Sequence, residues 1–155
     1  MARVPAAQRR SMKSGELAVW RSLVDTTTEL RRLLAAQLAQ DSRLSPGDYA
    51  VLLALSEAEG RRLRSSELAA TMDWERSRLS HHLGRMEKRG LIAREDCATD
   101  NRGAEVVMTD AGAEAFAGAT MPHLRAIKRH FADALSPEQF AALRDALGSI
   151  NQHLG

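Results

Sequence analysis

Residues 65–89 constrain the fold of this chain most strongly, because they predict two helices joined by a tight turn. The first helix has the sequence SSELAATM and stops at Asp73 and Trp74. The second has the sequence ERSRLSHHLGRMEKR and ends at Gly90, a residue favoured just beyond helix C-termini. Two short helices with so brief a connection are typical of a helix-turn-helix.

The second of these helices is amphipathic. At about 100° per residue, Leu79, Leu83 and Met86 fall within an arc of roughly 60° and form a packing face. The opposite side carries polar and basic side chains, namely Ser77, Arg78, His81, Arg85 and Lys88. Arginine can bond guanine through two hydrogen bonds, serine and histidine can bond base edges, and bases further along can contact phosphate. The pattern favours a helix that enters the major groove of DNA, and the alternative is an ordinary solvated helix face.

Two further helices are predicted before this pair. Apolar positions recur at helical spacing through residues 14–40, which lead into the turn-rich DSRLSPGD. Ser45 is then a helix N-cap, with Pro46 at the first helical position and Asp48 three residues after the cap. We expect this second helix to stop at Gly60.

After Gly90 the pattern changes from helical to extended. The segments LIAREDC (91–97) and AEVVMTD (104–110) are short and rich in β-branched and apolar residues. The turn-forming ATDNRG separates them, so a β-hairpin is predicted. The expected fold class is therefore mainly α with a small β-hairpin wing.

The C-terminal part is again helical. Thr109 can cap a long helix to about Leu135, with a kink or break near Pro122. The sequence SPEQ at 136–139 is a capping box and predicts a last helix to about Leu154.

The terminal helices carry more apolar surface than a small wing-bearing domain can cover by itself. The last helix has a heptad seam, formed by Phe140, Leu143, Leu147, Ile150 and Leu154. The helix before it has a stripe formed by Leu124, Ile127, Phe131 and Leu135. These faces can pack within one chain as a bundle, or between two chains as a two-fold dimer. We favour the dimer, because exposed stripes of this size usually mark partner surfaces.

Positive charge is concentrated in two places, although the formal net charge is only +2. Residues 1–13 hold four bases and no acid, and residues 59–94 hold nine bases against five acids. A basic mid-chain segment is typical of an element that binds a polyanion, although such a run is more often a solvated face.

Length and composition exclude several classes of protein. With 155 residues, 44% hydrophobic and 27% charged, the chain suits one domain, or one compact unit with an oligomerisation element. No run approaches the ~18 apolar residues of a membrane span and no signal peptide is evident, so we expect a soluble cytoplasmic protein. A single cysteine excludes an internal disulfide framework and a zinc site needing two thiolates. No catalytic constellation is evident, and no enzymatic activity, metal or cofactor is predicted.

The stretch from Ser65 through VVMTDAG resembles the winged helix-turn-helix of MarR-type transcriptional regulators. The specific features are MEKRGLI at the helix end, the D-x-R of Asp100 and Arg102, and the closing VVMTDAG. LSPGDYAVLLAL resembles the helix that leads into this domain, and the helix order extends the likeness to about residues 15–153. The resemblance implies an obligate homodimer that binds pseudo-palindromic DNA, usually as a repressor released by a small ligand or oxidant.

By position, the resemblance implies a phosphate contact for Arg85 and base contacts for Ser77, Arg78, Ser80 and His81. Arg102, at the hairpin tip, can enter the adjacent minor groove, where a narrow groove enhances the negative potential. Asp100 would orient Arg102 through an ion pair or bond the turn amides. The alternative is a plain surface turn.

Residues that sense an effector are harder to identify. The cleft between the dimer helices and the DNA-binding domain is the expected pocket, with Trp20, Asp73 and Trp74 as candidate wall residues. Core tryptophans are the more common outcome. Cys97, the only thiol, is a candidate redox residue, although most lone cysteines are inert.

These observations predict four regions: a basic flexible tail (1–13), an N-terminal dimerisation helix (14–44), a winged helix-turn-helix (45–110) and C-terminal dimerisation helices (111–155). The expected function is a homodimeric, sequence-specific transcriptional regulator, most often a repressor, whose partners are double-stranded DNA, a second copy of itself and a small-molecule effector. One alternative is a winged-helix protein-interaction or assembly module, and another is a ligand-binding protein whose DNA activity is secondary. The basic outward face of the second helix argues against the interaction module, because protein-binding faces tend to carry apolar anchors.

Overall fold

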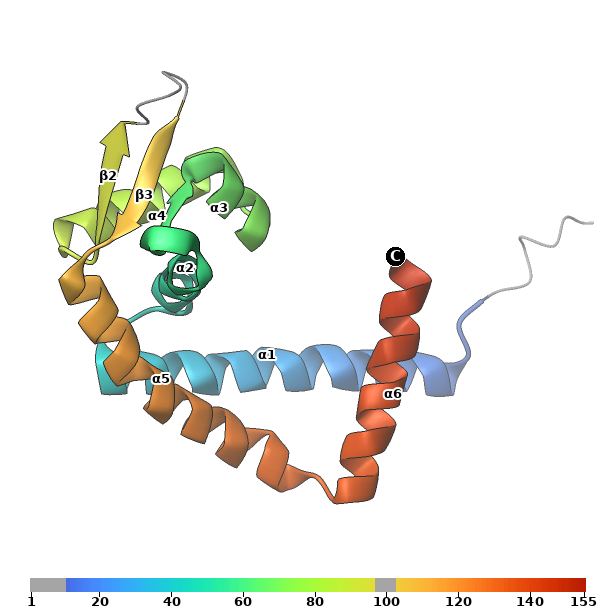
Figure 1. Ribbon diagram of the computed structural model, residues 1–155. Coiled ribbons are helices and arrows are strands. Elements are labelled where there is room, and N and C mark those ends of the chain that lie inside the picture. The colour runs from blue at the N-terminus through green and yellow to red at the C-terminus, as the bar shows by residue number, and fades with distance from the viewer. Residues whose placement is uncertain (1–10, 97–102) are drawn as a thin grey trace, which may run out of the picture. The chain divides into compact units, whose positions relative to one another are not determined.

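The computed structural model describes residues 11–96 and 103–155 (Figure 1). Six helices are present in the described part: α1 (Ser14–Ser42), α2 (Pro46–Glu57), α3 (Ser65–Met72), α4 (Arg76–Lys88), α5 (Asp110–His130) and α6 (Pro137–Leu154). Three strands accompany them, β1 (Arg62–Arg64), β2 (Ile92–Asp96) and β3 (Ala104–Met108), with the 3-10 turns η2 (Glu59–Arg61) and η3 (Ala132–Ala134). The mainly helical fold class with a small wing is confirmed.

The chain divides into two compact units, residues 1–33 and 34–155. In the described part of the first unit, α1 exposes every side chain except the half-buried Leu30 and Leu33. The second unit contains the end of α1 and all the other elements, and the rest of this subsection concerns it.

The helix starts are as the sequence predicts. Ser45 Oγ accepts a hydrogen bond from the Asp48 amide at 3.0 Å, and Asp48 Oδ2 accepts one from the Ser45 amide at 2.9 Å. Ser136 and Gln139 form the same reciprocal pair at the start of α6, at 3.2 and 2.9 Å. At α5, Thr109 Oγ1 accepts from the Gly112 amide at 3.0 Å. These bonds satisfy amide groups that have no partner inside the helix.

Helix α2 forms the centre of the core. It contacts α3, α4, α5 and β3, and Val51, Leu52 and Leu55 on it are fully buried. The other large side chains buried around it come from the turn before α2 and from α3, α4, β2 and β3: Leu44, Leu68, Leu79, Leu83, Met86, Ile92 and Val106. Because α2 is surrounded, its apolar positions are not confined to one stripe.

The sheet has three antiparallel strands in the order β1-β3-β2. The predicted hairpin is confirmed, with Ile92 opposite Met108 and Asp96 opposite Ala104. Strand β1 was not predicted. It has three residues, with one apolar side chain, Leu63, between two arginines, which is too short to show an alternating pattern. Its extended state comes from pairing with β3.

Helix α5 differs from the expectation in two respects. It continues through Pro122 without a break, and it ends at His130 rather than near Leu135, with the turn η3 in between. Proline removes one backbone hydrogen bond from a helix interior. Here Ala119 and Ala126, both fully buried, hold the helix on either side of that position. Tertiary packing therefore compensates for the missing bond.

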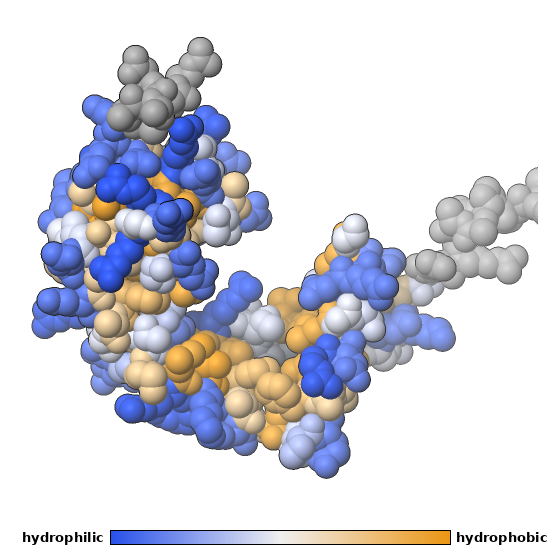
Figure 2. Space-filling model, viewed as in Figure 1, coloured by the Kyte–Doolittle hydropathy of each residue, from blue (hydrophilic) through white to orange (hydrophobic). Residues whose placement is uncertain are grey.

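The last two helices expose apolar side chains in the described part of the chain (Figure 2). The exposed residues include Met121, Leu124, Phe140, Leu147, Ile150 and Leu154. Phe131 and Phe140 contact each other across the α5–α6 connection, with ring centroids 5.8 Å apart. The predicted seam on α6 is thus present as surface rather than core.

Neither a membrane-spanning helix nor a metal-binding cluster is found within residues 11–96 and 103–155. Each helix there is too short or too polar to cross a bilayer. No three side chains among His, Cys, Asp and Glu in these ranges gather as metal ligands would.

Candidate nucleic-acid interface

Helix α4 is the element on which the candidate site depends, and its start is set by a tight turn after α3. Asp73 adopts the left-handed conformation at φ 52°, which aspartate tolerates better than most residues. The Trp74 amide then donates to the Ala69 carbonyl at 3.0 Å. This turn redirects the chain so that α4 begins at Arg76.

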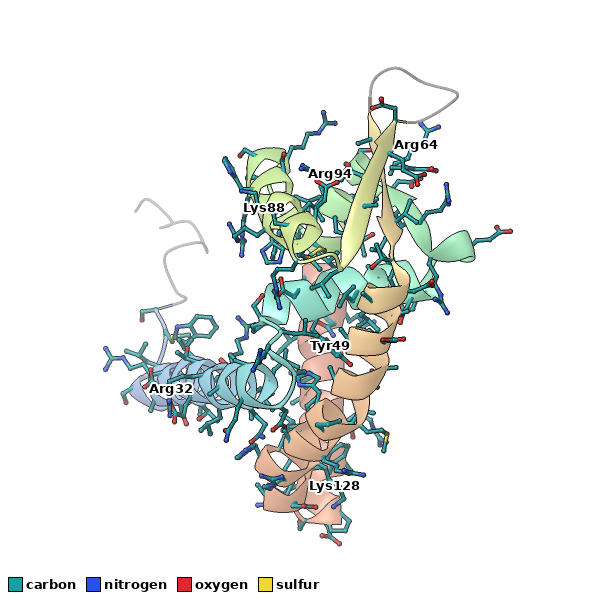
Figure 3. The ribbon with its side chains drawn as sticks, turned by 90° about the vertical axis from the view of Figure 1, so that its left-hand side faces the viewer. Arg32, Tyr49, Arg64, Lys88, Arg94 and Lys128 are labelled. Atoms are coloured by element: carbon teal, nitrogen blue, oxygen red, sulfur yellow. The ribbon has the colours of Figure 1, made fainter. Side chains whose placement is uncertain are left out.

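The two faces of α4 are separated as the helical wheel predicts. Leu79, Leu83 and Met86 are buried. The polar residues predicted to meet DNA are all exposed, namely Ser77, Arg78, Ser80, His81, Arg85 and Lys88 (Lys88 is labelled in Figure 3). The helix therefore presents a basic and hydroxyl-bearing surface on a firmly packed support.

The sequence analysis did not identify His82, which is buried on the packing side of α4. Its Nε2 lies 2.9 Å from Asp48 Oδ1, although the ring N–H does not point at that oxygen in hydrogen-bond geometry. Its Nδ1 lies 3.1 Å from the Arg85 guanidinium, which can only donate, so Nδ1 accepts and the ring is neutral. Burial lowers the pKa of His82 and outweighs the opposing attraction of the Asp48 carboxylate.

Asp48 connects α4 to the start of α2. Arg89 Nη1 donates to Asp48 Oδ2 at 2.7 Å, and Arg89 Nη2 donates to the Arg43 carbonyl at 2.5 Å. Burial raises the pKa of Asp48, but the Ser45 amide, Arg89 and His82 together hold it below its usual value. We call Asp48, His82 and Arg89 the Asp48 cluster. Because His82 and Arg89 are two turns apart, this cluster fixes α4 to α2 at two points.

Trp74 contacts Arg78 on the exposed face of α4. Its ring lies edge-on to the His82 ring at 5.1 Å, and the Arg78 guanidinium carbon lies 4.0 Å from its ring centroid. An arginine over a tryptophan face is held by a cation–π interaction. This contact restricts the positions that Arg78 can sample before it meets a ligand.

The candidate effector residues are not brought together by any contact that the structure describes. Trp74 packs on α4, Asp73 is an exposed helix cap, and Trp20 belongs to the first unit, where it is 54% exposed. The effector pocket therefore stays a prediction.

The wing is attached to α4 by an ion pair. Arg94 on β2 lies between α4 and the sheet, and its Nη2 is 2.8 Å from Glu87 Oε2 on α4 (Figure 3). Arg62 on β1 pairs with Glu105 on β3 at 3.0 Å. Cys97, Asp100 and Arg102 lie outside the described residues, so the expected roles at the wing tip stay predictions.

Comparison with known proteins shows which family has this architecture. A family model described as the MarR family matches residues 44–103. The structure of AbsC, a MarR family transcriptional regulator from Streptomyces coelicolor, is 37% identical, with 94% of this chain and 97% of that chain covered and a TM-score of 0.83. Sco3205, a MarR family transcriptional regulator from the same organism solved in complex with DNA, is 36% identical, covers 95% of this chain and 92% of its own, and has a TM-score of 0.86.

The chain belongs to the MarR family. Members of this family are DNA-binding transcriptional regulators and not enzymes, in agreement with the sequence analysis. The fold extends to more distant structures, such as the MarR C80S mutant from E. coli complexed with operator DNA, at 18% identity, 91% and 99% coverage and a TM-score of 0.75. A comparison with curated protein sequences found no significant match.

The sequence analysis did not predict the Asp48 cluster. Asp48 was recognised only as a capping residue, and His82 was given no role. The helical wheel does place His82 next to the buried Leu79 and Met86, so its burial could have been inferred. Its pairing with Asp48, 34 positions earlier, could not.

Proposed function

We propose that this MarR-family protein is a homodimer that binds a pseudo-palindromic operator through α4 and the wing, represses transcription, and is released by a small-molecule effector. The single observation that carries the proposal is the row of exposed Ser, Arg and His side chains along α4, on a helix fixed by the Asp48 cluster. The relative Sco3205, at 36% identity, was solved in complex with DNA, which supports a DNA-binding role for this chain.

The proposal assigns distinct tasks along α4. Ser77, Arg78, Ser80 and His81 near its start would read base edges, and Arg85 and Lys88 further along would contact phosphate. Arg102 would enter the minor groove with support from Asp100. Residues 45–110 would form the DNA-binding domain, with dimerisation through 14–44 and 111–155.

The direct test is a binding titration of the gene's own upstream region against random duplex across a series of salt concentrations. We expect tighter binding to the upstream region at every salt concentration, with an affinity that falls as salt rises. Equal affinity for both duplexes would instead support the alternative of a winged-helix protein-interaction module.

Arg78→Ala is expected to relax base preference. The substitution removes a bidentate donor to a base edge, so the affinity for the preferred operator should fall by about 1–3 kcal/mol while the affinity for random duplex changes little. Systematic single-base variants of the operator would locate the base pair that Arg78 reads. Arg129→Ala on α5 removes the same charge away from α4 and serves as the control.

Leu147→Glu is expected to disrupt the dimer. Leu147 is 44% exposed in the single chain and lies at the centre of the α6 seam, so a charge there would be buried against the partner. The dimer dissociation constant in analytical ultracentrifugation should rise at least about tenfold, which corresponds to roughly 1.4 kcal/mol. Gln152→Glu adds the same charge on the opposite side of α6 and should leave the dimer intact. Unchanged sedimentation of the Leu147 variant would contradict a dimer built on this seam.

Effector release is proposed from a ligand-bound neighbour of known structure. A neighbour of known structure, the RdhR-CbdbA1625 regulator, was solved in a 2,4-dichlorophenol-bound form, at 19% identity. Trp20, Asp73 and Trp74 stay the candidate pocket residues here, and Cys97 is the candidate redox residue. A change in Trp fluorescence on titration with candidate effectors, together with loss of operator binding, would identify the ligand.

A further inference from the structure

A cavity of about 500 Å³ lies between the start of α3, α4 and the wing strands β2 and β3. Its polar lining consists of three arginines and three serines: Arg64, Arg76, Arg94, Ser65, Ser66 and Ser80. At about 100° per residue Ser80 lies at the side of the α4 wheel, and this side faces the cavity together with Arg76, one turn earlier.

The cavity carries excess positive charge. Arg94 is neutralised by Glu87, at 2.8 Å. Arg76, by contrast, makes no ion pair with any acidic group in residues 11–96 and 103–155. The first turn of α3, at Ser65 and Ser66, adds backbone amides that a helix leaves without internal partners. Because Ser65 Oγ donates to the Ala104 carbonyl at 2.9 Å, α3 is joined to the wing strand β3 at one wall.

The position of the cavity determines what can reach it if α4 enters a major groove. The wing then lies at the adjacent minor groove, and the sugar-phosphate backbone that separates the two grooves crosses the surface between α4 and the wing. The cavity occupies that surface. Guanidinium groups bind phosphate through two parallel hydrogen bonds, and Arg76 lines this cavity whereas Arg78 and His81 do not.

We infer that this cavity binds a phosphate group of the DNA backbone, with Arg76 as the principal cation and Ser80 and the start of α3 as further donors. The inference rests on the proposed DNA-binding function and adds a site to it. It separates α4 into two stripes, in which Arg78 and His81 face bases and Arg76 faces the backbone, and it reassigns Ser80 from the base edges to the backbone.

The first test is Arg76→Gln in the full-length chain, with Arg144→Gln on α6 as the control that removes the same charge. Losing one phosphate contact per protomer, and so two per dimer, should reduce the slope of log K against log salt by about two units, and the affinity near 0.15 M salt by about thirtyfold. The loss should be the same for operator and random duplex, so the ratio of the two affinities stays unchanged. An Arg76 variant with the wild-type salt slope, or with a changed affinity ratio, would overturn the inference.

A second measurement identifies the phosphate. Operator duplexes with a single neutral methylphosphonate linkage are compared in turn, and one linkage per half-site should weaken wild-type binding but leave Arg76→Gln binding unaffected. Inorganic phosphate at millimolar concentration, against chloride at equal ionic strength, tests the free anion as occupant. The assignment to the DNA backbone would be overturned if inorganic phosphate competed with DNA for the wild type but not for Arg76→Gln, and if no methylphosphonate linkage weakened wild-type binding.

Different results would contradict the proposed function and the proposed phosphate site. If the wild type binds operator and random duplex equally, sequence-specific regulation fails whatever Arg76 does. If the wild type is specific and Arg76→Gln behaves like Arg144→Gln, only the phosphate site fails.

Discussion

Replacing Gly112 by alanine is expected to lower the free energy of unfolding by about 4 kcal/mol, because the new methyl group would cause a severe steric conflict. A Cβ atom at this position would lie 2.0 Å from the Leu91 carbonyl oxygen and 3.0 Å from the carbonyl carbon. Both are backbone atoms, so no side-chain rotation can relieve the contact. The wing and the start of α5 would have to separate.

That separation would break the bonds that join the two ends of the wing. The Thr109 amide donates to the Leu91 carbonyl at 3.2 Å, and Thr109 Oγ1 donates to the Gly90 carbonyl at 2.6 Å. Gly90 itself is left-handed, at φ 74°, which favours glycine at the end of α4. The junction therefore holds α4, the wing and α5 in one arrangement.

Gly118→Ala is the matched control, because it changes the same residue type on the same helix. No heavy atom lies within 4 Å of a Cβ built there, so alanine should raise stability by about 0.5–1 kcal/mol through helix propensity. Urea unfolding at one fixed protein concentration measures both variants. Equal stability of the two variants would show that the contact at Gly112 relaxes without cost.

Asp48→Ala is expected to destabilise the protein by about 3 kcal/mol, and to weaken DNA binding through the position of α4. The carboxylate is buried and accepts bonds from the Ser45 amide and Arg89, with His82 at 2.9 Å. Removing one partner of a buried charged cluster leaves the others unpaired, which costs more than the pair itself contributes. Part of the loss is the helix cap, which contributes about 1 kcal/mol.

Asp48→Asn separates these contributions, because the amide oxygen can still accept from the Ser45 amide but carries no charge. We expect it to recover the cap and not the ion pair, so its stability should fall between the wild type and Asp48→Ala. A variant as stable as the wild type would mean that the charge on Asp48 contributes nothing.

The stability loss expected for Asp48→Ala should depend on pH, because the pKa of Asp48 is shifted in the folded state. Because the pKa of this carboxyl is lowered in the folded state, its stabilisation is complete above the unfolded value of about 3.9 and is lost as pH falls through the folded pKa. The stability gap between the wild type and Asp48→Ala should therefore be constant near neutral pH and shrink below about pH 4. Burial lowers the pKa of His82, so stability should already begin to fall below about pH 6.5.

Much of the helical framework could be predicted from local sequence. The caps at Ser45, Thr109 and Ser136 and the stop at Gly90 depend on residues within one turn of each other, so short segments specify them. The division of α4 into a buried and an exposed face follows from helical periodicity alone.

Features that join distant segments depended on the tertiary structure. Strand β1 exists because β3 pairs with it, and α5 continues through Pro122 because buried alanines flank that residue. The Asp48 cluster joins positions 41 residues apart, and the cavity collects arginines from β1, α4 and β2. Periodicity records which face of an element is apolar, but it carries no information about which other element that face meets. The sequence by itself therefore determined the amphipathic helix α4 and its two faces, whereas packing alone decided how that helix is held and which charges lie beside it.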